Sequence, residues 1–323
     1  MAHAGPLAAA VAGERASTVG RFAPSPTGPL HFGSLVAALG SFLSARAAGG
    51  RWLLRVEDVD QPRSVPGAAD AILQALEHHG LGWDGPVLWQ SQRTDAYQAA
   101  LEQLRRAGWV YGCSCSRREI AAAARRGVAG AVYPGSCRQR ARPWSGREAL
   151  RLRSTSPGIR YRDAVQGDQF QELEAEVGDF VLRRADGLHT YQLAVVIDDA
   201  AQGMTEVVRG ADLLGSTPRQ ILLQQRLGLP TPRYAHLPVA VDAAGQKLSK
   251  QSGAAPLRLH APGRNLVAGL EFLGQGPPPE LAREAVGTII DWALTNWSPQ
   301  QIPRVAALPV PAAGGGLADP GAA

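Results

Sequence analysis

Apolar residues along this chain form two alternating patterns, short continuous runs and runs with helical spacing. Continuous runs bounded by glycine, proline or acidic residues predict strands at residues 19–23, 51–56, 189–197, 205–208 and 236–241. Apolar residues three and four positions apart predict helices from residue 31 to the glycines at 49–50 and at residues 67–79, 94–107 and 217–227. Because the two patterns alternate, we expect an α/β protein rather than an all-helical or all-β one.

The same patterns divide the chain into parts. Cysteines, arginines and loop-forming residues interrupt the alternation once, which predicts an insertion within one α/β domain. A single amphipathic helix is predicted near the C-terminal end, at about 281–296. We expect a disordered tail at 1–18, the first half of the α/β domain at 19–112, the insertion at 113–175, the second half at 176–260, a helical extension at 261–298 and a second disordered tail at 299–323.

Composition narrows the setting. The chain contains no run of about 18 apolar residues, so we expect no membrane-spanning helix. Three cysteines among 323 residues argue against a disulfide framework and for a reducing compartment, so we expect a cytoplasmic protein. Nothing in the sequence demands an assembly larger than a monomer.

The formal net charge of +5 conceals a basic stretch. Residues 101–160 hold 13 arginines and three acidic residues, a net charge of +10, so the rest of the chain is acidic. Most charge runs are only solvated surface, but a concentrated arginine block is also what contact with a phosphate backbone requires. We expect a nucleic-acid partner, with Arg117, Arg118, Arg125 and Arg126 on its phosphates.

Lysine is almost absent. The chain has 31 arginines but only two lysines, and both lie in the segment Lys247-Leu248-Ser249-Lys250. An ammonium is a compact, flexible point charge, whereas a guanidinium is a planar fork. A solvated surface pair is the ordinary alternative, but the scarcity of lysine elsewhere predicts a site that needs a point charge.

A second candidate site lies where the first strand leads into the first helix. The loop at residues 24–29 is rich in proline and glycine, and His31 and Gly33 stand at the predicted helix start, where backbone N–H groups attract anions. Neither the Walker pattern nor the Gly-x-Gly-x-x-Gly dinucleotide pattern is present. The alternative is a connector in which His31 only caps the helix.

Taken together, these two sites resemble the HIGH and KMSKS elements of class I aminoacyl-tRNA synthetases. The opening at residues 21–28 and the lysine segment are similar to the glutamyl and glutaminyl branch, which also matches residues 51–60, 191–193 and 207–212. Two positions depart from the pattern. Ser34 replaces the second histidine of the HIGH element, which weakens its expected share of phosphate binding, and Gln251 replaces the final serine of the lysine loop.

The resemblance implies a Rossmann-like class I synthetase catalytic domain that activates L-glutamate with ATP and Mg²⁺. Catalysis would fall to Lys250, His31 and Lys247, and ATP would be bound by His31, Gly33 and Lys250. The glutamate pocket would consist of Arg21, Phe22, Ala23, Pro24, Ser25, Glu57, Tyr191 and Arg209.

Within this pocket, charge suggests the roles. A guanidinium grips a carboxylate with two hydrogen bonds, so Arg209 and Arg21 suit the glutamate side chain, and Glu57 suits its ammonium group. The alternatives are internal ion pairs, between Arg209 and Asp212 or between Glu57 and either Arg55 or Arg63.

Only 73 residues follow Lys250, too few for the anticodon-reading domains of a glutamyl-tRNA synthetase. A catalytic half of this kind resembles the glutamyl-Q tRNA(Asp) synthetase family, which attaches glutamate to queuosine at the wobble position of tRNA(Asp). The alternatives are a truncated glutamyl-tRNA synthetase that charges a tRNA 3′ end, a nucleotidyltransferase or ligase that uses no tRNA, and a non-catalytic tRNA-binding relative.

The cysteines provide an independent indication. Cys113 and Cys115 form a Cys-x-Cys pair, and Cys137 follows. Three thiolates suit Zn²⁺, which takes four ligands in structural sites, but no histidine lies between Cys115 and Cys137. The family resemblance implies that Tyr133 is the fourth ligand of a zinc-containing insertion. Three small buried thiols are the alternative.

Overall fold

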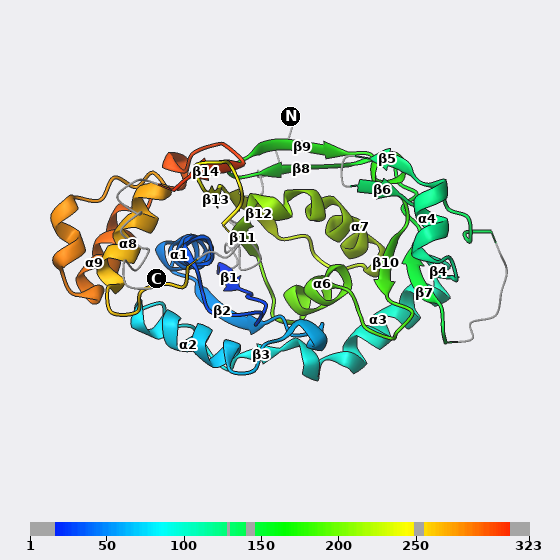
Figure 1. The fold of residues 1–323 in the computed structure, drawn as a ribbon, viewed down its shortest axis with the longest axis horizontal. Coiled ribbons are helices and arrows are strands. Elements are labelled where there is room, and N and C mark those ends of the chain that lie inside the picture. Colours follow the sequence, from blue (N-terminus) through cyan, green and yellow to red (C-terminus); the bar gives the residue numbers. More distant parts are fainter. Residues whose placement is uncertain (1–16, 128–129, 140–145, 249–254, 311–323) are drawn as a thin grey trace, which may run out of the picture.

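The structure is a computed structural model that describes residues 17–127, 130–139, 146–248 and 255–310. Helices and strands alternate through most of these residues, which confirms the predicted α/β class (Figure 1). The described residues up to 171 contain β1 (Val19–Phe22), α1 (Phe32–Ala47), β2 (Arg51–Val56), α2 (Ala68–His78), β3 (Leu88–Trp89), α3 (Thr94–Arg106), β4 (Val110–Cys113), α4 (Arg117–Ala123), β5 (Arg125–Gly127), β6 (Gly130–Val132), β7 (Ala149–Leu152), β8 (Ile159–Asp163) and β9 (Gly167–Gln171).

The described residues after 171 contain α5 (Leu173–Glu176), β10 (Phe180–Arg183), α6 (Tyr191–Ala201), β11 (Glu206–Gly210), α7 (Thr217–Leu227), β12 (Arg233–Leu237), β13 (Val239–Val241), α8 (Pro262–Phe272), α9 (Val286–Asn296) and β14 (Ala307–Pro309). Short 3₁₀ helices occupy Gln61–Arg63, Gln90–Gln92, Ala211–Ser216, Pro279–Arg283 and Pro299–Gln301. None of the helices in the described ranges is both long enough and apolar enough to cross a bilayer.

Two groups of parallel strands form the centre of the molecule. Strands β1, β2 and β3 pair in parallel, as do β11, β12 and β8, and β9 adds to β8 in the antiparallel sense. The two groups meet where the amide of Thr205 donates to the carbonyl of Val19 over 3.0 Å. Helix α1 packs on both β1 and β11, with Leu35, Leu39 and Leu43 fully buried. This packing fixes the ends of β1 and β11 relative to each other.

Strands β4, β5, β6, β7 and β10, together with helix α4, lie at the opposite end of the molecule from α8 and α9 (Figure 1). Strands β10, β7 and β4 make an antiparallel sheet, and β5 and β6 make a hairpin beside α4. Strands β8 and β9 also fall within the predicted insertion at 113–175, yet β8 pairs with β12 of the central sheet. The boundaries of the insertion stay a prediction.

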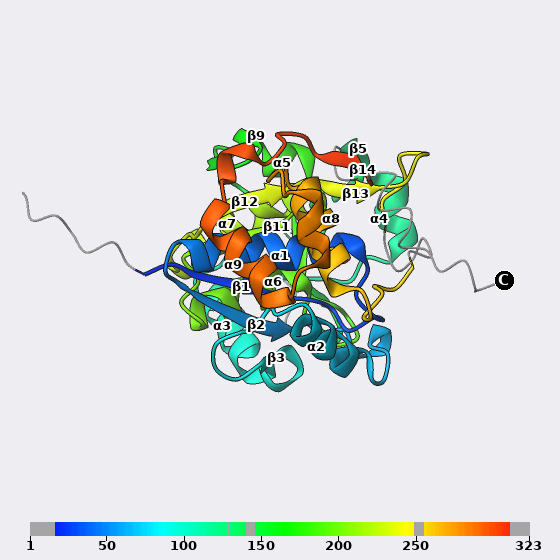
Figure 2. The ribbon, with the colours of Figure 1, turned by 90° about the vertical axis from the view of Figure 1, so that its left-hand side faces the viewer.

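The C-terminal helices cover α1 on the side away from the central strands, as Figure 2 shows. The predicted tail at 299–323 is wrong for residues 299–310, because β14 pairs in parallel with β13 and Ile302 is buried. A Pro-rich composition gives no sign that such a segment will add to the edge of a neighbouring strand. Residues 1–16 and 311–323 of the predicted tails lie outside the described residues.

Two predicted strands differ from the structure. Residues 189–197 were predicted as a strand, but α6 occupies this place, because a short apolar run buried on several sides has the same pattern in a helix as in a strand. The predicted strand at 236–241 is divided between β12 and β13. Pro238 lies between them and has no N–H to donate to a ladder. The predicted helix at about 281–296 begins later, at Val286.

Candidate active site

A cleft of about 500 Å³ opens where β1, β2, β11 and β12 end. Loops that follow the carboxyl ends of parallel strands are the usual place for ligands in α/β folds. The cleft is lined by all but one of the predicted catalytic, ATP-binding and glutamate-binding residues: Arg21, Phe22, Ala23, Pro24, Ser25, His31, Gly33, Glu57, Tyr191, Arg209 and Lys247. The exception, Lys250, lies outside the described residues.

One wall of the cleft contains a network of buried charges. Arg21 donates from Nε to Oδ1 of Asp199 over 3.1 Å, and Arg55 lies 2.8 Å from the same oxygen. Burial alone would raise the pKa of Asp199, but the two guanidinium groups hold this pKa below its ordinary value. The carboxylate therefore stays charged and is shared between Arg21 and Arg55.

Glu57 stands at the end of β2, where this network meets the cleft. Arg55 donates to its Oε1 over 3.3 Å, so the alternative pairing of Glu57 with Arg55 is present. Burial raises the pKa of Glu57, and the positive charges of Arg55 and Arg21 oppose this rise only in part. Glu57 is thus a carboxylate that an entering cation would help to keep ionised.

Arg209 has a different environment from Arg21. Its Nε donates to Nε2 of His236 over 3.1 Å, and one terminal nitrogen donates to the phenol oxygen of Tyr191 over 3.1 Å. Its other terminal nitrogen donates to Thr217 and to Gln220, each over 2.8 Å. All four groups are uncharged hydrogen-bond partners. The guanidinium is therefore held in place without a carboxylate partner among these contacts.

The alternative pairing of Arg209 with Asp212 is not among the contacts of the described residues. Asp212 instead binds Lys247, whose Nζ lies 2.6 Å from Oδ2. The start of the lysine loop is therefore attached to the segment that follows β11, at the mouth of the cleft.

His31 stands at the first turn of α1, as predicted. Its Nδ1 accepts a hydrogen bond from the amide of Ser34 over 3.3 Å, so the capping role is present, and the residue also lines the cleft. A side chain at Gly33 would meet the His31 ring at 3.3 Å and the carbonyl of Leu248 at 3.6 Å. The tighter contact is with the His31 ring, so glycine at this position leaves room for that ring, whereas the distance to the Leu248 carbonyl is an ordinary van der Waals contact.

A second cavity, of about 560 Å³, adjoins the first and shares Ser25, Thr27, Glu57 and Tyr191 with it. Its other walls were not predicted from the sequence, and they include Asp60, Arg63, Gln90, Arg184, His189 and Thr190. Two buried atoms of these walls, Oε1 of Gln90 and Nε2 of His189, have no hydrogen-bond partner in the structure. A polar ligand in this cavity could form hydrogen bonds with these two atoms.

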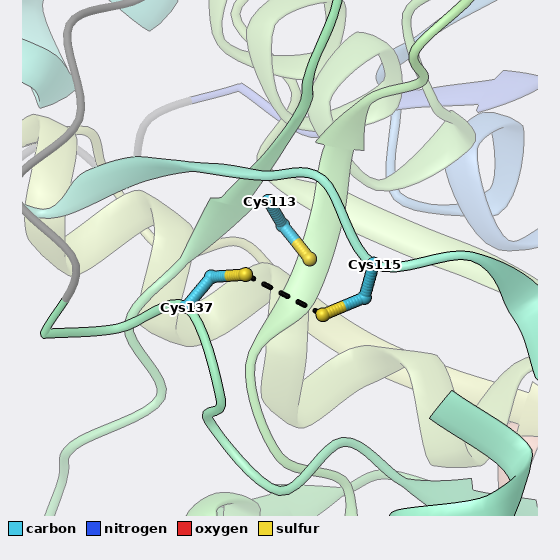
Figure 3. A group of neighbouring side chains, drawn as sticks. All are labelled: Cys113, Cys115 and Cys137. Atoms are coloured by element: carbon cyan, nitrogen blue, oxygen red, sulfur yellow. Dashed lines mark hydrogen bonds between the residues drawn. The ribbon is translucent and has the colours of Figure 1, made fainter. Parts of the chain in front are cut away.

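The three cysteines come together at the far end of the molecule, and their side chains point toward one another in Figure 3. Their sulfur atoms lie within 4.8 Å of one another, close enough to hold a metal ion. The phenol oxygen of Tyr133 lies 3.3 Å from Sγ of Cys113 and 3.8 Å from Sγ of Cys115. Three sulfurs and one oxygen therefore converge on one point.

The arginine-rich stretch is only partly exposed. Arg138 and Arg151 contact buried Asp179, whereas Arg117 and Arg118 are exposed on α4. The side chain of Arg126 lies outside the described part. Unburied positive charge is also offered elsewhere in the stretch, by Arg105, Arg106, Arg125, Arg147 and Arg160, so α4 is one of several exposed basic parts.

Comparison with known proteins matches nearly the range that was predicted as the α/β domain with its insertion, residues 19–260. Residues 17–261 match the family described as tRNA synthetases class I (E and Q), catalytic domain. The glutamyl-Q tRNA(Asp) synthetase of Aromatoleum aromaticum is 57% identical over 286 residues, which cover 88% of this chain and 90% of that protein. The protein of the same name from Pseudomonas aeruginosa is 52% identical over 295 residues, 91% of this chain and 98% of that protein.

Among solved structures, the chain is similar to a glutamate tRNA ligase from Elizabethkingia meningosepticum in complex with its amino acid. The TM-score is 0.76 at 26% sequence identity, and the match covers 92% of this chain and 68% of that one. A glutamate-tRNA synthetase from Elizabethkingia anophelis gives a TM-score of 0.75 at 25% identity. The cleft described above thus lies in a fold shared with glutamate-specific enzymes.

Proposed function

This chain belongs to the glutamyl-Q tRNA(Asp) synthetase family of class I tRNA synthetases, and from this we propose that it glutamylates queuosine in tRNA(Asp). It would first activate L-glutamate with ATP and then transfer the glutamyl group to the modified base at the wobble position. The observation that carries the proposal is one cleft with a guanidinium, Arg209, that has uncharged partners, and a carboxylate, Glu57, whose pKa burial raises.

Glutamate matches these charges. Its side-chain carboxylate would bind Arg209, with Arg21 nearby, and its ammonium group would bind Glu57. Tyr191 would contribute its phenol and one wall of the pocket. The segment from Arg21 to Ser25 would form the floor, and the α-carboxylate would then face the phosphates of ATP.

In the activation step, an oxygen of the α-carboxylate attacks the α-phosphorus of ATP. A new carbon–oxygen–phosphorus anhydride forms, the bond to the bridging oxygen breaks, and pyrophosphate leaves with the bonding electrons. Such steps depend on positioned positive charge around the phosphate oxygens. We assign this role to Lys250, Lys247 and His31, with Gly33 beside the phosphates and Mg²⁺ on the triphosphate.

The cysteine cluster fits a structural zinc ion. Cys113, Cys115 and Cys137 would supply thiolates and Tyr133 a phenolate, which makes the four ligands of a closed tetrahedral site. The ion would take no part in the reaction. It would hold together a segment of short strands and loops that has few apolar residues of its own.

In the transfer step, a hydroxyl of queuosine attacks the carbonyl carbon of the adenylate, and AMP leaves. The second cavity supports this step, because it shares Glu57 and Tyr191 with the first and has polar walls. Queuosine carries a cyclopentene cis-diol, which is similar to the ribose diol of a tRNA 3′ end. We propose that the enzyme acts as a monomer in the cytoplasm, where its tRNA is found.

Glutamate-dependent exchange between pyrophosphate and ATP tests the activation step. We expect exchange with glutamate, much less exchange with glutamine, and loss of exchange in Lys250→Ala. Undiminished exchange in Lys250→Ala would contradict the role given to the lysine loop. Transfer is tested separately, with tRNA(Asp) that carries or lacks queuosine, and labelling that ignores queuosine would favour a truncated glutamyl-tRNA synthetase.

A further inference from the structure

Three buried polar side chains lie side by side on adjacent strands behind the cleft. Arg209 of β11 is in register with His236 of β12, and Asp163 at the end of β8 pairs with the same strand. The side chains of His236 and Asp163 are fully buried, and neither residue lines the cleft. Their contact with the cleft therefore runs through Arg209.

The hydrogen bonds determine where the proton of the imidazole sits. Nδ1 of His236 lies 2.6 Å from Oδ2 of Asp163, and a carboxylate can only accept there, so Nδ1 carries the hydrogen. Nε2 of His236 receives the N–H of Arg209 Nε over 3.1 Å and also lies 3.1 Å from Oγ1 of Thr217, so Nε2 carries no hydrogen and acts as an acceptor. Burial and the charge of Arg209 lower the pKa of His236, in agreement with a neutral ring.

We propose that His236 and Asp163 are positioning residues that hold Arg209 for the side-chain carboxylate of the substrate. This inference rests on the proposed function, since it assigns a specificity role within the same site. Asp163 fixes the tautomer, the neutral ring fixes the guanidinium, and the guanidinium meets the substrate.

The two cleft arginines show why a neutral ring suits this task. Arg21 is bound by the carboxylate of Asp199, which compensates its charge. Arg209 is bound by the imidazole of His236, which orients the guanidinium and leaves its charge for a ligand. A ligand carboxylate would then replace water at a buried cation, whereas the carboxamide of glutamine would leave that charge uncompensated. The pair thus favours glutamate over glutamine.

Asp163→Asn tests the tautomer without a change of shape. Oδ1 of Asp163 accepts from the amides of Val165, Gln166 and His236, and an asparagine oxygen can keep these bonds. The new amide N–H would face Nδ1 of His236 and move the ring hydrogen to Nε2, where it would oppose the N–H of Arg209. We expect the KM for glutamate to rise at least about tenfold and the KM for ATP to stay within about twofold.

Variants of the histidine complete the test. His236→Leu removes the acceptor and should raise the KM for glutamate as Asp163→Asn does. His236→Gln restores a neutral acceptor and should raise it less. The matched control is His79→Asn, because His79 is also fully buried but binds Ala75 and Asn265, away from the cleft. It should leave the KM for glutamate within about twofold.

The readout is pyrophosphate exchange with glutamate and ATP varied separately, after thermal unfolding has shown that each variant is folded. If His236→Leu fails to fold, Asp163→Asn decides alone. The proposal would be overturned if Asp163→Asn left the KM for glutamate unchanged. It would also be overturned if Asp163→Asn and His79→Asn raised the KM values for glutamate and for ATP equally. An absence of glutamate-dependent exchange in the wild type would contradict the proposed function and this role together.

Discussion

The carboxylate of Asp199 lies 3.1 Å from the guanidinium of Arg21, and the side chains of both residues are less than a tenth exposed. Arg55 approaches the same carboxylate to 2.8 Å. Asp199 therefore stabilises two buried cations at once, one of which lines the cleft. Charges in such positions are costly when their partner is removed, since water cannot replace it.

Asp199→Asn should lower the free energy of unfolding by about 3–5 kcal/mol, because buried Arg21 loses its carboxylate partner and buried Arg55 keeps only Glu57. Urea denaturation at neutral pH measures the change. The matched control is Asp168→Asn, which breaks a pair with Arg162 in which both side chains are 79% exposed. It should have no measurable effect. Equal stability of the two variants would contradict the account of this network.

The affinity for glutamate should fall on acidification at a pH above the ordinary range of a carboxyl group. Because burial raises the pKa of Glu57, its carboxylate takes up a proton at a higher pH than a free glutamate side chain does. The ammonium of the substrate needs the ionised form, so the KM for glutamate is lowest above this pKa and rises as the pH falls through it.

The pH profiles of wild type and Glu57→Gln, compared between about pH 5 and pH 8, isolate this effect from the titration of other groups such as His236. Glu57→Gln should have a higher KM for glutamate than the wild type at every pH. Its KM should also lack the increase at low pH that protonation of Glu57 causes in the wild type. If the KM for glutamate depended on pH in the same way in both proteins, Glu57 would not bind the ammonium group of the substrate.

Tyr133→Phe should weaken zinc binding at least about tenfold, because it removes one of four proposed ligands. Competition with a coloured chelator measures the affinity and also the stoichiometry, for which we expect one ion per chain. Tyr111→Phe is the matched control, since Tyr111 belongs to the same buried cluster but donates its hydroxyl to Asp179. If both variants kept the zinc affinity of the wild type, Tyr133 would not be a ligand and the protein would supply only the three thiolates.

Binding to tRNA should depend steeply on salt, and the exposed arginines of α4 should account for part of that dependence. Replacement of Arg117 and Arg118 by alanine should reduce the slope of log K against log salt concentration by about 1.4, for two phosphate contacts on a single strand. The matched control removes Arg105 and Arg106, which both bind Glu102. An equal change of slope in both double variants would show that only net charge matters.

The sequence was sufficient where the site consists of contiguous motifs. The helix start at His31 and the cysteine pair at Cys113 could be predicted from local spacing, and the opening segment from Arg21 was indicated by its resemblance to a known family. The structure brings Arg21 and His31 into one cleft. Glu57 and Tyr191, which the family resemblance also indicated, line the same cleft, although Tyr191 begins a helix where a strand was expected.

The residues behind the cleft could not be predicted in this way. Asp163 and His236 lie 73 positions apart and meet only because β8 and β12 are neighbours in the sheet. Asp199 follows an apolar run in α6, and the local sequence gives no sign that it pairs with Arg21. The first contact depends on the pairing of β8 with β12, and the contact of Asp199 with Arg21 joins helix α6 to strand β1. Local spacing carries no information about either.

The most direct test of the central claim is incorporation of labelled glutamate into tRNA(Asp) that differs in two features, the presence of queuosine and the presence of the 3′-terminal adenosine. We predict labelling that requires queuosine and survives removal of the terminal adenosine. Labelling that is indifferent to queuosine and disappears with the terminal adenosine would contradict the proposed acceptor and indicate an enzyme that charges the 3′ end.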